Sequence, residues 1–66
     1  MNPFYIVNSF YGENDPRNNV YHFNNLPEVF HFVDLVRQEK AKTASTEEIQ
    51  LVISQPNGKV LETHVV

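Results

Sequence analysis

The sequence predicts a small α/β (α+β) domain of order β-β-α-β-β, with four strands in one sheet and one helix packed on one face. Three observations lead to this fold class. Aromatic and β-branched residues gather in four short segments, as is typical of strands. Apolar residues recur at helical spacing in one segment, between the second and third of these. Turn residues join the strand segments into two hairpins. We expect residues 1–66 to form a single domain.

The first two strands are predicted at residues 4–11 and 19–24. The first is rich in aromatic and β-branched residues and ends at Gly12. Asp15 and Pro16 mark the turn between the two strands, because an Asp-Pro pair favours turn initiation. Apolar residues on both faces of the first strand predict a central place in the sheet rather than an edge.

A helix is predicted to follow Asn25 and to end before the loop at residues 43–46. Asn25 and Glu28 resemble a capping box, and Pro27 falls in the first turn, where its missing N–H costs nothing. Basic residues in the last turn suit the negative end of the helix dipole. The face predicted to turn inward carries Leu26, Val29, Phe30, Val33, Val36 and Lys40.

The last two strands are predicted to form a hairpin around residues 56–58, Pro-Asn-Gly. This sequence fits a type I turn followed by a glycine in the left-handed region, which makes a three-residue loop. Such a loop pairs Gln55 with Lys59, and the register then extends along both strands. The predicted pairs are Ile53 with Leu61, Leu51 with Thr63 and Ile49 with Val65 on one face, and Gln50 with His64 and Val52 with Glu62 on the other.

The order of strands in the sheet is a separate prediction. A right-handed crossover through the helix places the first and last strands side by side and parallel. That arrangement is β-grasp-like.

Composition limits the kinds of function that are open to the chain. It has no cysteine, which excludes disulfides and thiolate metal sites. A net charge of −3 with scattered basic residues disfavours nucleic-acid binding, which needs several phosphate contacts. No apolar run is long enough to span a membrane, and the N-terminus lacks the pattern of a signal peptide. We therefore expect a cytoplasmic protein that does not associate with membranes.

No catalytic, cofactor or metal site is predicted. The histidines, His22, His31 and His64, lack the spacing of zinc ligands. None of the serines lies in a nucleophile elbow, and two glycines are too few for a phosphate-binding loop. We therefore expect a protein without a cofactor that is not an enzyme.

Two surfaces are candidates for binding a partner. On the outer side of the helix, Phe32 and Leu35 are one turn apart and form an apolar patch. The alternative is that Phe32 packs over the edge of the sheet and Leu35 is merely exposed. The residues assigned to this surface are Phe32, Leu35, Glu28, Glu39 and His31.

The second candidate is the sheet face turned away from the helix, which antiparallel sheets normally keep polar. If the helix covers Ile49, Leu51 and Ile53, that face is unusually apolar. Its predicted residues are Tyr5, Tyr11, Val52, Val60 and His64.

These features predict a small protein-interaction module, an inhibitor or modulator that binds a larger protein assembly. Compact cysteine-free chains of this length are common among viral, phage and mobile-element proteins that act on host machinery. The alternatives are a protein that binds single-stranded nucleic acid through tyrosines on the open sheet, and a structural homodimer. Turn and capping signals such as these are common to many folds and identify no family.

Overall fold

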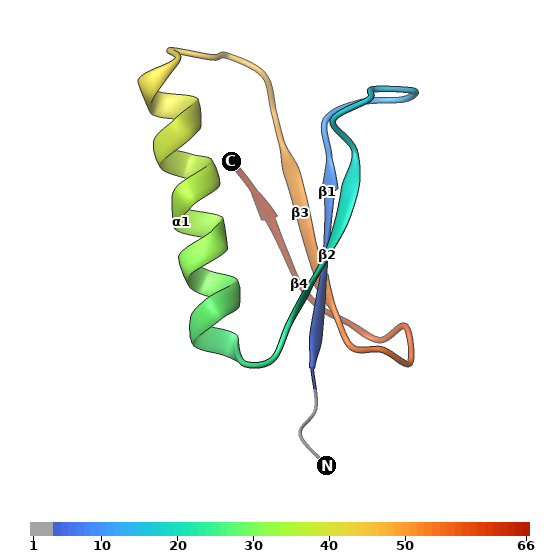
Figure 1. The fold of residues 1–66 in the computed structure, drawn as a ribbon. Coiled ribbons are helices and arrows are strands. Elements are labelled where there is room, and N and C mark those ends of the chain that lie inside the picture. Colours follow the sequence, from blue (N-terminus) through green and yellow to red (C-terminus); the bar gives the residue numbers. More distant parts are fainter. Residues whose placement is uncertain (1–3) are drawn as a thin grey trace.

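The computed structural model describes residues 4–66 and shows one antiparallel sheet with a helix across one face (Figure 1). This arrangement confirms the predicted α+β fold class and the order of its elements. No helix in these residues is both long and apolar enough to cross a membrane. The elements are β1 (Tyr5–Phe10), β2 (Asn19–Phe23), α1 (Leu26–Lys42), β3 (Gln50–Ser54) and β4 (Val60–Val65).

The strands lie in the order β2-β1-β3-β4, so the predicted β-grasp-like arrangement is wrong. β1 is central, as predicted, but its second neighbour is β3 rather than β4. The reason lies in burial. Leu51 and Ile53 of β3 are almost completely buried, which suits a strand with neighbours on both sides. β4 carries Glu62, Thr63 and His64, which suit an exposed edge.

The core lies between α1 and one face of the sheet. Side chains paired across neighbouring strands share a face, and Val7 of β1 pairs with both Tyr21 and Ile53. Val7 of β1 is fully buried, and so is Val29 of α1. The helix therefore covers this face of the sheet. The buried apolar residues are Val7, Val29, Val33, Ile49, Leu51 and Ile53.

The inward face of α1 differs from the prediction on one flank. Val29 and Val33 are buried as predicted, whereas Phe30 is 44% exposed. Phe32 packs against the core instead, because it meets Tyr21 and Phe23 of β2 with ring centroids 4.7 and 5.3 Å apart. Aromatic pairs at these distances are favourable. They turn the helix so that Phe32 faces the sheet.

Both ends of α1 are capped by local hydrogen bonds. The side chain of Asn25 accepts a hydrogen bond from the backbone N–H of Glu28 at 3.0 Å, which confirms the predicted cap. At the other end, the N–H groups of Ala44 and Ser45 donate to the carbonyls of Ala41 and Lys40, in the pattern of a Schellman motif. Ala44 has φ +54°, a backbone conformation that normally favours glycine.

The β3–β4 hairpin follows the predicted turn but not the predicted register. Gly58 has φ +91°, and the N–H of Gln55 donates to the carbonyl of Lys59 at 2.8 Å, as expected for the three-residue loop. Ser54 pairs with Val60, but Ile53 then pairs with Glu62. Leu61 is therefore an extra residue in β4, a β-bulge.

The bulge exchanges the two faces of β4 relative to the prediction. The register after it pairs Leu51 with His64, so His64 and Glu62 lie on the helix side of the sheet. Val65 pairs with Gln50 and lies on the other side. All five predicted pairs are thus wrong by one residue, namely Ile53–Leu61, Leu51–Thr63, Ile49–Val65, Gln50–His64 and Val52–Glu62.

Candidate partner-binding surfaces

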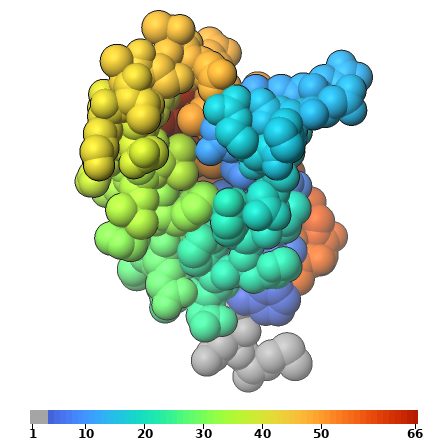
Figure 2. Space-filling model, turned by 45° about the horizontal axis from the view of Figure 1, so that its top comes forward, coloured from blue at the N-terminus to red at the C-terminus, as the bar shows by residue number. Residues whose placement is uncertain are grey.

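Two adjoining hollows lie along the flank of α1 that faces β2. The larger, about 520 Å³, opens between the C-terminal end of α1 and the β1–β2 loop, and Figure 2 shows it as a depression in the surface. The smaller, about 410 Å³, lies nearer the start of the helix, and Phe32 and Leu35 line both hollows. We call the two together the flank groove. Its other lining residues include Tyr11, Arg17, Val36, Glu39, Lys40 and Glu47 in the larger hollow, and Phe23, Pro27, Glu28 and His31 in the smaller.

The structure brings all the residues predicted for the helix surface to this groove. Leu35 is 49% exposed, and the charged or polar residues Glu28, His31 and Glu39 stand beside it. Phe32 follows the alternative prediction, because it packs over the edge strand β2 instead of standing free. The side chain of Phe32 therefore lines both hollows.

The strand next to this groove, β2, has one edge without a neighbouring strand. The N–H of Val20 donates to the side chain of Asn19 at 2.8 Å rather than to β1, while the carbonyl of Asn19 faces Ser9 of β1. Backbone groups of an antiparallel strand alternate in direction. The N–H and carbonyl groups of Val20 and His22 therefore point outward from this edge.

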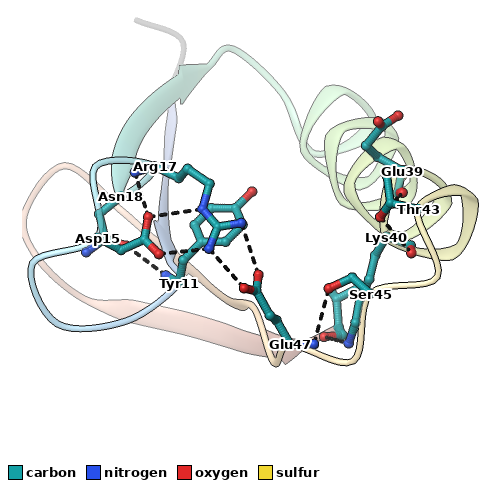
Figure 3. Close-up of polar contacts among 10 residues, drawn as sticks. Tyr11, Asp15, Arg17, Asn18, Glu39, Lys40, Thr43, Ser45 and Glu47 are labelled. Atoms are coloured by element: carbon teal, nitrogen blue, oxygen red, sulfur yellow. Dashed lines mark hydrogen bonds and ion pairs between the residues drawn. The ribbon is translucent and has the colours of Figure 1, made fainter.

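An ion-pair cluster lies at the mouth of the larger hollow (Figure 3). Arg17 contacts Asp15 at 2.8 Å and Glu47 at 3.0 Å, and its guanidinium carbon lies 4.4 Å from the centre of the Tyr11 ring. Asn18 supports the same loop, since its side chain bonds the N–H of Tyr11 and the carbonyl of Gly12. The cluster ties the β1–β2 loop to the segment that enters β3.

Pairing shifts the ionisation of both partners. Side-chain hydrogen bonds from Arg17 lower the pKa of Asp15 from 3.8 to about 2, with a second contribution from the backbone N–H of Arg17. The hydrogen bonds to Asp15 and then to Glu47 raise the pKa of Arg17. Both groups therefore stay charged throughout the neutral range, and the cluster clamps the β1–β2 loop to the segment that enters β3. No pattern in the sequence signals this cluster, because Arg17 and Glu47 are 30 residues apart.

The sheet face away from the helix is only partly the one predicted. Val52 and Val60 lie on it, as expected, since they pair with Asn8 and Ser54. Tyr5 and Tyr11 pack against the core on the helix side, and His64 lies on that side as well. The placement of these three was wrong because both faces of residues 4–11 are apolar and because the bulge reverses β4. The open face therefore lacks the two tyrosines on which base stacking depended.

We define the open face by the side chains that alternation and pairing place on it. Its exposed apolar residues include Phe10 and Val65, with exposed fractions of 46% and 59%. Phe4 joins the face through His22, whose ring centre lies 6.1 Å from its own. The residues are Phe4, Ile6, Asn8, Phe10, Val20, His22, Gln50, Val52, Ser54, Val60, Thr63 and Val65.

The histidines lie apart from one another. His22 is on the open face, His31 lines the smaller hollow, and His64 contacts Glu62 at 3.0 Å on the helix side of β4. Within residues 4–66, no group of three or more His, Cys, Asp or Glu side chains is close enough to hold a metal ion.

No family model matches this chain, and no curated protein or solved structure matches it either. Function is therefore inferred from the flank groove and the open face themselves.

Proposed function

We propose that this chain is a non-catalytic protein-binding module whose flank groove takes up an extended, largely apolar segment of another protein. Occupying such a segment would make the chain an inhibitor or modulator of the assembly to which the segment belongs. One observation carries the proposal: β2 is an uncharged, unprotected edge strand that lies beside an apolar groove.

The two edges of the sheet differ in how they are protected. Edge strands are normally blunted by charged residues, proline or bulges, which prevent pairing with other chains. β4 has such devices, namely the bulge at Leu61 and the carboxylate of Glu62. β2, Asn-Val-Tyr-His-Phe, has no bulge, no proline and no Lys, Arg, Asp or Glu. The β2 edge is therefore the one suited to accept another strand.

A strand added at this edge would bond the outward backbone groups of Val20 and His22, and would replace the side chain of Asn19 as the partner of the Val20 N–H. Side chains directly opposite each other share a face, so a residue opposite Tyr21 points to the helix side, over Phe32. Its neighbours two positions away lie opposite Asn19 and Phe23, and Phe23 lines the smaller hollow. The groove therefore favours a segment with apolar residues at every second position, a recognised mode of peptide binding.

The charges around the groove indicate what flanks those apolar positions. Arg17 is held by Asp15 and Glu47, and the amine of Lys40 donates to the carbonyl of Val66. Glu28 and Glu39 are exposed, and neither takes part in an ion pair within residues 4–66. Since opposite charges steer association, the preferred segment carries Lys or Arg beside its apolar residues.

Selection from a displayed library of random peptides tests the proposal even though the partner is unidentified. We expect enriched peptides to alternate apolar residues and to carry basic flanks. Leu35→Glu should abolish their binding. Phe30→Glu is the matched control, because Phe30 lies on the same helix with 44% exposure and lines neither hollow. Circular dichroism should first show that both variants keep the native fold.

The backbone contribution can be tested with the same peptides. N-methylation of residues that bond the β2 edge removes their N–H donors and should abolish binding, whereas methylation of the alternating residues should not. Amide resonances of Val20 and His22 should shift on binding. Equal binding to Leu35→Glu and the wild type, or peptides that shift the resonances of Val52 and Val60 but not those of Val20 and His22, would contradict the proposal.

A further inference from the structure

The open face carries many apolar side chains and no charged ones. Charged residues make up 20% of the chain, but none of the Asp, Glu, Lys or Arg side chains belongs to this face. His22 is its one titratable group among the described residues. The helix side of the sheet, by contrast, carries Glu62 at its β4 edge. Glu62 is the single Asp, Glu, Lys or Arg residue of the four strands, and it lies on the helix side.

Because the open face lacks charged groups, it can pack against the same face of a second copy of the chain. Two copies of a protein with a net charge of −3 repel each other, and a surface with acidic groups would bring those groups together in a symmetric contact. In a two-fold contact the same patch is present on both subunits, so it must be complementary to itself. An apolar face with amide and hydroxyl groups meets this condition.

The size of the face is sufficient for a weak dimer. Phe4, Phe10, Val20, Val60 and Val65 are each between 40% and 59% exposed. These side chains, with the half-buried Ile6 and Val52, are the apolar groups that two faces in contact would bury, and a contact confined to one small sheet face lies near the lower end of specific interfaces, about 1,200 Å² in total. Two such sheets pack about 10 Å apart, with side chains interdigitating between them.

The core has only one apolar layer, which is a second reason to expect that the open face of the sheet is covered. The buried apolar residues all lie on the helix side. The central strands β1 and β3 present Ile6 and Val52 on the other side, where both are only half-buried. Burial of these side chains would add a second apolar layer to a chain of 66 residues, for which one layer gives marginal stability.

We propose that the open face is the interface between two copies of this chain, which pack sheet against sheet and leave both flank grooves outside the contact. This inference rests on the open face alone and is independent of the proposed peptide groove.

Sedimentation equilibrium over about 10 μM to 1 mM protein measures the association, a range suited to an interface at the lower size limit. We expect the mass of the wild type to rise from one protomer to two. Val65→Glu should keep the mass of one protomer across this range, because it would bury two carboxylates against each other. Val65 is 59% exposed, so circular dichroism should show an unchanged protomer fold.

Leu35→Glu is the matched control, since it adds the same charge at a similarly exposed position in the flank groove. It should dimerise like the wild type. A wild-type mass that stays at one protomer, or that grows beyond two, would overturn the inference. Dissociation by Leu35→Glu but not by Val65→Glu would also overturn it, because the contact would then lie at the groove. Peptide binding by a monomeric Val65→Glu variant tests the proposed function separately.

Discussion

Arg17 Nη1 lies 3.0 Å from Glu47 Oε2, and this ion pair joins the β1–β2 loop to the segment that enters β3, beside the larger hollow (Figure 3). Arg17 is held from behind by Asp15, whose side chain is only 19% exposed. A guanidinium with two carboxylate partners has a fixed orientation, because its donors form a planar fork. The two segments that form this wall of the hollow are therefore joined by charged groups.

Acid should weaken this clamp. The pKa of Asp15 is about 2 in the folded protein against 3.8 ordinarily, so its pairing stabilises the fold above about pH 4 and loses that effect as the pH falls towards 2. We expect Asp15→Asn to show a shallower loss of unfolding free energy between these pH values. Urea unfolding at several pH values measures it, with Glu13→Gln, in the same loop but in no ion pair within residues 4–66, as the control. Parallel pH profiles for Asp15→Asn and the wild type would contradict this expectation.

Phe32 should be a structural residue rather than a free anchor. Its ring packs against Tyr21 and Phe23, so Phe32→Ala should lower the unfolding free energy by about 3 kcal/mol. Phe30→Ala should cost less than about 1 kcal/mol, because Phe30 is 44% exposed. Chemical denaturation of both variants gives the comparison. Equal losses would show that the two rings are buried alike.

The β3–β4 turn should depend on Gly58. Its φ of +91° is strained for any other residue, so Gly58→Ala should cost about 1–2 kcal/mol although an added methyl group has free space. Gly12→Ala also meets no atom within 4 Å and has no such φ, so its effect should stay within about 0.5 kcal/mol. Thermal unfolding of the pair separates backbone strain from packing. A tolerated Gly58→Ala would mean that the turn adopts another geometry.

The C-terminal cap of α1 offers a stabilising change. Ala44 has φ +54° at the position where the Schellman motif favours glycine, so Ala44→Gly should raise the unfolding free energy by about 1 kcal/mol. Ala41→Gly, three residues earlier within α1, should lower it by a similar amount. Opposite signs for one substitution at neighbouring sites are the test. A loss at both positions would rule out the left-handed cap.

The local elements could be predicted because short-range chemistry determines them. Asn25 identified the start of the helix, and Gly58 identified a turn that pairs Gln55 with Lys59. The strand order could not be predicted in the same way, since it depends on which strand of the second hairpin buries more apolar surface. Leu51 and Ile53 decide that question only once the sheet has formed.

The candidate surfaces were predicted in part. Leu35 was identified from helical spacing alone, whereas the role of Phe32 depends on rings from β2 that lie nearby only in the folded chain. Tyr5 was placed on the wrong face because Phe4 and Ile6 alternate with residues that are equally apolar. The β2 edge has a sequence signal, an absence of Lys, Arg and proline, which becomes meaningful only when the strand order is known.

The bulge at Leu61 decides which side chains of β4 lie on the open face. Strand faces alternate with every residue, so a regular ladder in which Leu61 paired with Ile53 would reverse β4 beyond that point. Glu62 and His64 would then enter the open face, and Val65 would leave it. Deletion of Leu61 should instead leave the open face and its self-association unchanged, because it removes the extra residue and keeps Ile53 paired with Glu62.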